Sequence, residues 1–117
     1  MNSNGALAER AAANYLRKKR YKLLDFNYYT KFGEIDLIFK HKKSIVFVEV
    51  KARDSKHGVS PKAFVDRTKQ EKIIKTAQYY LMKNNIKLSP RFDVVEVIYE
   101  NNEIKSIEHL ENAFTLD

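Results

Sequence analysis

Two neighbouring runs of strand-forming residues constrain the fold of this chain more than any other feature. Apolar and polar residues alternate over residues 33–39, and residues 45–52 are rich in Val, with Ile and Phe among them. Such runs are typical of strands that pack against a core. Residues 41–44 form the only polar break between the runs. The pattern therefore predicts two strands joined by a turn centred on Lys42-Lys43.

This turn sets a register for the two strands. Three apolar pairs then share one face of the hairpin: Ile35 with Val50, Leu37 with Val48, and Phe39 with Val46. The other face is polar, with Asp36 opposite Glu49 and Glu34 opposite Lys51. Because Glu49 and Lys51 are two residues apart on one strand, their side chains project in the same direction.

Two opposed carboxylates destabilise a hairpin unless a positive group lies between them. A divalent cation such as Mg²⁺ is one such group, and it takes one or two carboxylates from a protein. Lys51 beside the cation would orient or deprotonate a water, or neutralise charge in a transition state. In the alternative interpretation, Asp36 leans toward solvent and Glu49 pairs with a nearby lysine. The hairpin by itself favours neither interpretation.

An acid-x-Lys triplet alone is a weak signal, because this chain contains three of them: Glu49-Val50-Lys51, Asp54-Ser55-Lys56 and Glu103-Ile104-Lys105. The second lies in an expected loop. The third follows Asp93, but a turn at Asn101-Asn102 would place Asp93 opposite Leu110 and away from Glu103. Only the first combines an opposed aspartate with basic surroundings.

The rest of the chain supplies the other elements. A loop over residues 54–60 precedes a second helix, which is capped by Ser60-Pro61 or by Asp66 and ends near Asn84. The expected elements are a helix over residues 4–19, strands over 22–29, 33–39 and 45–52, the second helix, and strands over 91–99 and 103–110.

The order α-β-β-β-α-β-β predicts an α/β fold. The second helix is long enough for a crossover, which permits parallel pairing of the strands that it joins. We therefore expect a mixed sheet with a helix packed against it. The chain has no repeat or linker, so residues 1–117 are expected to form a single domain.

Charge is distributed unevenly along the chain. The net charge is +7, and residues 1–75 carry 18 basic and 8 acidic residues, whereas residues 76–117 carry 4 and 7. A basic field of this kind favours a polyanionic partner, with nucleic acid and an anionic membrane face as the two candidates. The alternative is that the basic residues only keep the surface soluble.

The composition also narrows the cellular location. The chain has no cysteine, which excludes disulfides and thiolate zinc sites and fits a reducing compartment. No apolar run approaches the length of a membrane span, and the first residues lack an apolar signal-peptide core. We expect a soluble, cytoplasmic protein.

The motifs together resemble a known group. The runs Gly33–Ile38, Val46–Arg53 and Arg91–Val95 are similar to those of the YraN-like family of small bacterial proteins, within the PD-(D/E)xK nuclease superfamily. Ala8-Glu9, Tyr15-Leu16 and Asn112-Ala113-Phe114 also match. The chain has Ile35 where the superfamily's name has Pro, a departure that many members share. The resemblance implies a restriction-endonuclease-like mixed sheet flanked by helices, and similarity to Holliday-junction resolvases.

The resemblance also implies a site. Asp36 and Glu49 would bind Mg²⁺ or Mn²⁺ together with the Val50 carbonyl, Lys51 would be the catalytic lysine, and Glu9 would be a helix-borne acid near the metal. The implied activity is that of a metal-dependent DNA endonuclease, or phosphodiesterase, acting on branched DNA. A junction cutter needs two sites, so the analogy suggests a homodimer. The alternative function is a non-catalytic nucleic-acid-binding module with a nuclease-like fold.

Several other residues allow two interpretations. The pairs Tyr28-Tyr29, near Lys31, and Tyr79-Tyr80 fit either core packing or base stacking. Lys69, at the start of the second helix, fits either phosphate binding or ordinary surface placement. The histidines are isolated in the sequence, which disfavours a histidine metal site: His41, His57 and His109.

Overall fold

The computed structural model describes residues 3–57 and 65–115. The order of elements confirms the prediction: α1 (Ser3–Lys18), β1 (Lys22–Thr30), β2 (Gly33–His41), β3 (Ser44–Asp54), a short 3₁₀ turn (Ser55–His57), α2 (Arg67–Lys83), β4 (Ser89–Glu100) and β5 (Glu103–Phe114). Asp66 is the N-cap of α2, and its carboxylate accepts a hydrogen bond from the backbone N–H of Lys69 at 2.8 Å. The other proposed cap, Ser60-Pro61, lies outside the described residues.

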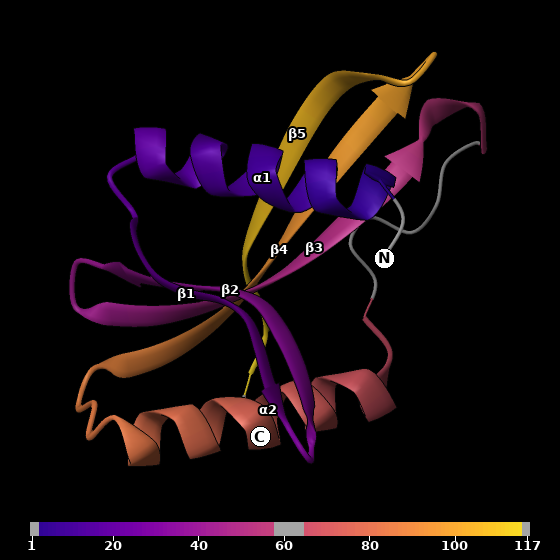
Figure 1. Cartoon of the computed structure of the whole chain (residues 1–117). Coiled ribbons are helices and arrows are strands. Elements are labelled where there is room, and N and C mark those ends of the chain that lie inside the picture. The colour runs from indigo at the N-terminus through magenta and orange to yellow at the C-terminus, as the bar shows by residue number, and fades with distance from the viewer. Residues whose placement is uncertain (1–2, 58–64, 116–117) are drawn as a thin grey trace.

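The five strands form one mixed sheet in the order β1-β2-β3-β4-β5. Among the described residues, only β3 and β4 pair in parallel, and α2 lies in the connection between them, as expected for a crossover. Figure 1 shows α1 on one side of the sheet and α2 on the other. This arrangement matches the expected restriction-endonuclease-like fold.

The sheet separates two apolar clusters. The cluster on the α1 side contains Ala8, Ala12 and Leu16 from the helix and Leu37, Phe39, Val46, Val48, Val95 and Val97 from the strands. The cluster on the α2 side contains Ile73, Ala77 and Tyr80 from the helix and Ile35, Ile38, Ile45, Phe47, Phe92 and Val94 from the strands. Burial on both faces explains why β3 reads as a nearly continuous apolar run.

The predicted register of β2 and β3 is confirmed over the inner part of the hairpin. Leu37 pairs with Val48 and Phe39 with Val46, and the ladder ends at Leu37. The third predicted pair is wrong, because Ile35 packs in the α2-side cluster whereas Val50 packs against the α1-side cluster.

A bend in β1 and β2 explains this difference. Asn27 has a left-handed backbone with φ of 48°, and beyond it Tyr28 pairs with Ile35. The rings of Tyr28 and Tyr80 then meet edge to face at 5.0 Å. Figure 1 shows the outer half of the β1–β2 hairpin turning away from β3 toward α2. The bend opens the sheet beside Asp36.

The register of β4 and β5 also differs from the prediction, because the pairing contains two irregularities. Glu100 pairs with Glu103, as the turn at Asn101-Asn102 requires, but the register then shifts and Val94 takes Leu110 as its partner. Asp93 lies at a second irregularity between Phe92 and Val94, so its predicted position opposite Leu110 is wrong. In the described part of the chain, no helix is long and apolar enough to span a membrane.

Candidate active site

Asp36 and Glu49 meet in a pocket of about 470 Å³ on the α2 side of the sheet. Its lining comes from β2, β3 and the start of α2: Gly33, Glu34, Asp36, Glu49, Asp66, Arg67, Thr68, Lys69, Lys72 and Ile73. Leu37 and Val48 pack on the opposite face, against α1. The prediction that the two acids share one face of the hairpin is therefore confirmed.

Asp36 stands where β2 leaves β3. Its Oδ2 accepts a hydrogen bond from the backbone N–H of Val50 at 2.8 Å, in place of a further ladder bond. Burial and the negative charge of Glu49 raise the pKa of Asp36 to about 8, and a hydrogen bond to the Glu49 carboxyl group acts in the same direction. At neutral pH Asp36 is therefore mostly protonated when no metal is bound.

Glu49 has a second partner that the hairpin pattern did not identify. Its side chain is 6% exposed, and its Oε2 lies 2.5 Å from Nζ of Lys69 on α2. Burial lowers the pKa of Lys69, but the hydrogen bond and charge of Glu49 outweigh burial and raise it. The lysine pairing of the alternative interpretation is thus present, whereas Asp36 is half-buried and lines the pocket.

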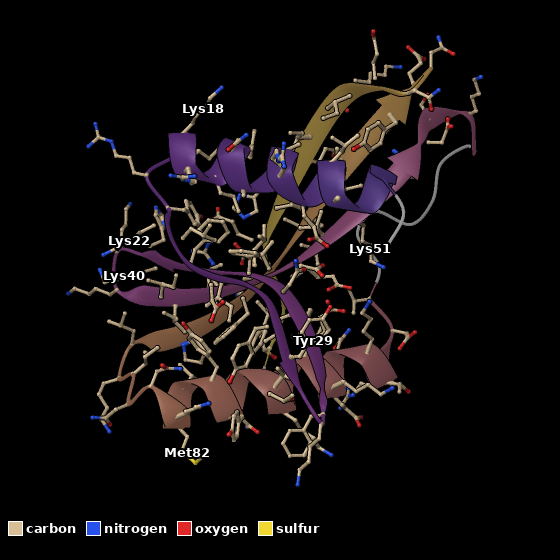
Figure 2. All side chains as sticks on the ribbon, viewed as in Figure 1. Lys18, Lys22, Tyr29, Lys40, Lys51 and Met82 are labelled. Carbon is tan, nitrogen blue, oxygen red and sulfur yellow. The ribbon has the colours of Figure 1, made fainter. Side chains whose placement is uncertain are left out.

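Lys51 lies two residues beyond Glu49 on β3, beside Glu96 of β4 in the parallel register. Figure 2 shows it toward the C-terminal end of β3. Its side chain is partly buried and makes no hydrogen bond or ion pair with residues 3–57 or 65–115. Its ammonium group is therefore not engaged by the rest of the described site.

Glu34 does not stand opposite Lys51 as predicted, because the ladder between β2 and β3 ends at Leu37. It pairs instead with Tyr29 across the β1–β2 hairpin. Tyr29 donates a hydrogen bond to the Glu34 carboxylate, and this bond and the charge of Glu34 raise the pKa of the tyrosine. Glu34 still lines the pocket, and with Asp66 it brings the acids of the lining to four.

Glu9 lies in a different pocket, of about 340 Å³, between α1 and the bent part of β1. Burial and the charges of Glu34 and Glu49 raise the pKa of Glu9, against a hydrogen bond from Asn27. The charge of Glu9 also contributes to the raised pKa of Asp36. Glu9 thus acts on the acid pair through its field and does not line the same pocket.

The first two turns of α2 supply the part of the site that the strand pattern did not contain. Arg67, Lys69 and Lys72 place three basic side chains around the pocket. The sequence signal for their position is Asp66, whose role as N-cap fixes where the helix begins and which residues form its first turn. Lys69, left open between phosphate binding and plain surface, contacts an acid of the site.

A second buried acid lies elsewhere in the sheet. Asp93 is fully buried, and its carboxylate accepts bonds from Arg91 Nε at 2.9 Å, Arg91 Nη2 at 2.7 Å and the backbone N–H of Asn112 at 2.9 Å. It also lies 2.7 Å from Nε2 of His109. Burial raises the pKa of Asp93, but the hydrogen bonds from His109, Arg91 and Asn112 outweigh burial and lower it.

Comparison with known protein families identifies the family of this chain. The profile of UPF0102, an uncharacterised protein family, matches residues 8–97. The chain belongs to the UPF0102 family. This is the YraN-like family that the motifs resemble. UPF0102 therefore covers most of the chain, including every residue of the candidate site.

Relatives from several bacteria support this membership. A UPF0102 protein of Caldanaerobacter subterraneus subsp. tengcongensis is 48% identical over 114 residues, which cover 94% of this chain and 93% of the relative. Those of Persephonella marina and Clostridioides difficile are 41% and 45% identical, covering 97% and 94% of this chain and 94% and 95% of the relatives. Their names state no activity, so the function has to be argued from the chemistry of the site.

The acid pair fits a hard divalent cation. Carboxylate oxygens are the ligands that Mg²⁺ and Mn²⁺ prefer, and two of them leave coordination positions for water and phosphate oxygens. The described residues contain no group of three or more His, Asp or Glu side chains placed to bind a metal. Asp36 and Glu49 form a two-acid site, to which the neighbouring backbone or a substrate would add oxygen ligands.

Proposed function

We propose that this UPF0102 protein is a metal-dependent phosphodiesterase that acts on DNA. The supporting observation is the acid pair: Asp36 and the buried Glu49 share a pocket, and the pKa of Asp36 is raised to about 8 by desolvation and by Glu49. Structural ion pairs do not normally bring two acids together, whereas a hydrolytic metal site does. The basic residues at the start of α2 suit a phosphate-bearing substrate.

The chain's own residues take distinct roles in this proposal. Asp36 and Glu49 hold the cation, and the Val50 carbonyl assists because the N–H of the same residue already points at Asp36. When bound, the cation polarises the phosphodiester and assists ionisation of an attacking water. Lys51, which is otherwise unengaged in the described site, orients that water or balances the growing negative charge. Glu9 tunes the acid pair through its field.

The ion pair between Lys69 and Glu49 favours a second candidate function. A lysine ammonium group 2.5 Å from Glu49 neutralises this acid without any metal. A chain that kept the fold and the basic surface but held its acids in this way would bind nucleic acid without cutting it. This is the non-catalytic binding module.

A nuclease assay separates the two functions. The protein is incubated with branched, duplex and single-stranded DNA in Mg²⁺, in Mn²⁺ and in EDTA. We expect cleavage of at least one substrate with metal and none in EDTA. Asp36→Asn should abolish both metal binding and cleavage, whereas Lys51→Ala should retain metal binding and lose at least about 100-fold in rate. DNA binding without cleavage in every metal would instead support the binding module.

Nucleic-acid binding itself is tested by its salt dependence. The excess of basic residues lies in positions 1–75. Neutralising four to six phosphates gives a slope of roughly −4 to −5 in a plot of log affinity against log salt. An affinity that stays constant from low to moderate salt would contradict the electrostatic part of the proposal.

Oligomeric state follows from the substrate. If branched DNA is the preferred substrate, two sites have to act on opposite strands, and we propose a homodimer. Sedimentation with and without a DNA junction tests this, and a monomer on the junction would limit the proposal to single-site cutting.

A further inference from the structure

A groove lies between the tip of the β1–β2 hairpin and the C-terminal half of α2. It measures about 430 Å³ and is lined by Tyr28, Tyr29, Thr30, Lys31, Phe32, Tyr79 and Lys83. We call these residues the aromatic groove. The bend of the hairpin toward α2, seen in Figure 1, brings its two walls together. Thr30 Oγ1 and Thr76 Oγ1, 3.2 Å apart, link the hairpin to the helix.

Core packing accounts for only part of the aromatic groove. Tyr28 meets Tyr80 edge to face and lies against the α2-side cluster. In contrast, the side chains of Tyr29, Phe32 and Tyr79 are 70%, 37% and 37% exposed. Exposed aromatic rings that gather in one concave surface indicate a binding site, because a monomer gains nothing from leaving them in water.

The lysines of the groove define the chemistry of its ligand. Lys31 Nζ lies 5.4 Å from the centre of the Phe32 ring, and Lys83 Nζ lies 5.9 Å from that of Tyr79. Each ring is therefore paired with a cation at the same groove. None of the described residues lining the groove is acidic. A ligand with flat apolar faces and negative charges at short intervals matches both features.

The groove also lies next to the candidate active site, because Tyr29 and Thr30 of the groove pair with Glu34 and Gly33 of the acid pocket. Figure 2 shows Tyr29 on the bent half of the hairpin, beside α2. On α2, Lys69, Lys72, Tyr79 and Lys83 run from one pocket to the other. A strand bound at the acid pair would reach the groove along this helix.

We propose that the aromatic groove binds unpaired nucleotides next to the site of phosphodiester cleavage. Bases in a duplex stack on each other and hide their faces, whereas unpaired bases are free to stack on Tyr29, Phe32 and Tyr79. Lys31 and Lys83 contact the phosphates of the same strand. The position of these nucleotides relative to the cut rests on the proposed function. Their binding does not, because it requires neither metal nor turnover.

Binding in EDTA tests the groove independently of catalysis. Fluorescence anisotropy at one fixed salt concentration compares a blunt DNA duplex with the same duplex carrying a short unpaired extension, made of DNA or of RNA. We expect the extended duplexes to bind more tightly. The double variant Phe32→Leu, Tyr79→Leu should lose about 10-fold or more in affinity for the extended duplexes and less than about twofold for the blunt one.

Two control variants keep the test specific. Tyr79→Phe retains the aromatic ring and should bind like the wild type. Met82→Ala removes a side chain that is 69% exposed on α2 but does not line the groove, and it should change neither affinity. Melting curves of each variant confirm folding, and Lys83→Gln repeats the test without altering a ring.

The outcomes distinguish this proposal from the proposed function. An equal loss for blunt and extended duplexes, or no loss for either, would overturn binding of unpaired nucleotides. If the groove variants behave as expected but no metal supports cleavage, only the phosphodiesterase proposal fails. If Asp36→Asn abolishes cleavage while the groove variants bind like the wild type, only the groove proposal fails.

Discussion

Two aspartates of this sheet, the half-buried Asp36 and the buried Asp93, have opposite environments. Asp93 receives hydrogen bonds from Arg91, His109 and a backbone N–H, and its pKa is lowered. Asp36 receives one backbone N–H, stands against Glu49, and has a pKa raised to about 8. A satisfied acid contributes to stability, whereas an acid held against another acid is costly until a ligand arrives.

The surroundings of Asp93 and of the Asp36–Glu49 pair suit different roles. The Asp93 cluster is built as a closed ion-pair network, and Tyr21 extends it by accepting a bond from Arg91 at 2.7 Å. The Asp36–Glu49 pair opens onto a pocket with a basic rim. We therefore interpret Asp93 as structural and the acid pair as functional.

The largest effect is expected for Asp93→Asn. The change leaves Arg91 and His109 without their charged partner in a buried position. We expect the free energy of unfolding to fall by about 3 kcal/mol, as is usual when one member of a buried ion pair is removed. Urea denaturation at neutral pH measures this loss.

Glu111→Gln is the matched control for this variant. Glu111 is the exposed partner of Arg91, at 3.3 Å, and its removal should cost at most about 0.5 kcal/mol. Because the pKa of Asp93 is lowered in the folded state, its contribution is present above about pH 4 and is lost as the pH falls through the folded pKa. A loss for Asp93→Asn no larger than for Glu111→Gln would contradict the structural role.

The second prediction concerns divalent metal. Mg²⁺ or Mn²⁺ at millimolar concentration should raise the melting temperature of the wild type by roughly 5–10 °C, because the native state binds the ion preferentially. Asp36→Asn should abolish this increment, whereas Asp93→Asn should retain it. The titration is repeated with a DNA ligand, which adds phosphate oxygens to the coordination shell. An unchanged melting curve in both titrations would remove the metal site.

The sequence predicted the placement of Asp36 and Glu49 on one face of the hairpin, but it did not predict the bend beside them. Alternation around the turn at Lys42-Lys43 was enough to bring Asp36 and Glu49 to one face, because register follows from buried pairs such as Leu37 with Val48. The bend at Asn27 was not predictable, since no local pattern signals its left-handed backbone, and it moved Ile35 to the other cluster.

The partners of both acids depend on contacts distant in sequence. Lys69 reaches Glu49 because Asp66 caps α2 and so places Lys69 in its first turn, and because α2 packs against β2. Asp93 was weighed only against a strand partner, whereas a bulge in β5 brings the backbone N–H of Asn112 to its carboxylate. Periodicity predicts which face a residue takes, but these pairings are set by how elements pack on each other.

The third prediction is a pH dependence. In metal-free protein the folded state holds a proton on Asp36 up to about pH 8, whereas the unfolded chain releases it near pH 4. The folded state therefore binds more protons in this window, so stability falls as the pH rises from about 4 to 8. Asp36→Asn should remove most of this slope and stabilise the metal-free protein at pH 8 by about 1 kcal/mol or more.

Denaturation in EDTA across this pH range measures the slope. Glu71→Gln, an exposed acid on α2, serves as the control and should leave the slope unchanged. If Asp36→Asn destabilises the protein at pH 8, the acid pair is not under electrostatic strain, and the contrast with Asp93 loses its basis.

The smallest effect is expected at Lys69, where the functional and structural interpretations of the acid pair meet. Lys69 neutralises Glu49 in the absence of metal, yet its side chain is 51% exposed, so Lys69→Gln should cost only about 0.5–1 kcal/mol in EDTA. The same change removes a cation that competes with metal for Glu49, so the melting-temperature increment from Mn²⁺ should become larger than in the wild type. Lys72→Gln, at the same pocket rim, should alter neither value. A smaller Mn²⁺ increment in Lys69→Gln would mean that the lysine helps to assemble the metal site and does not occupy it in advance.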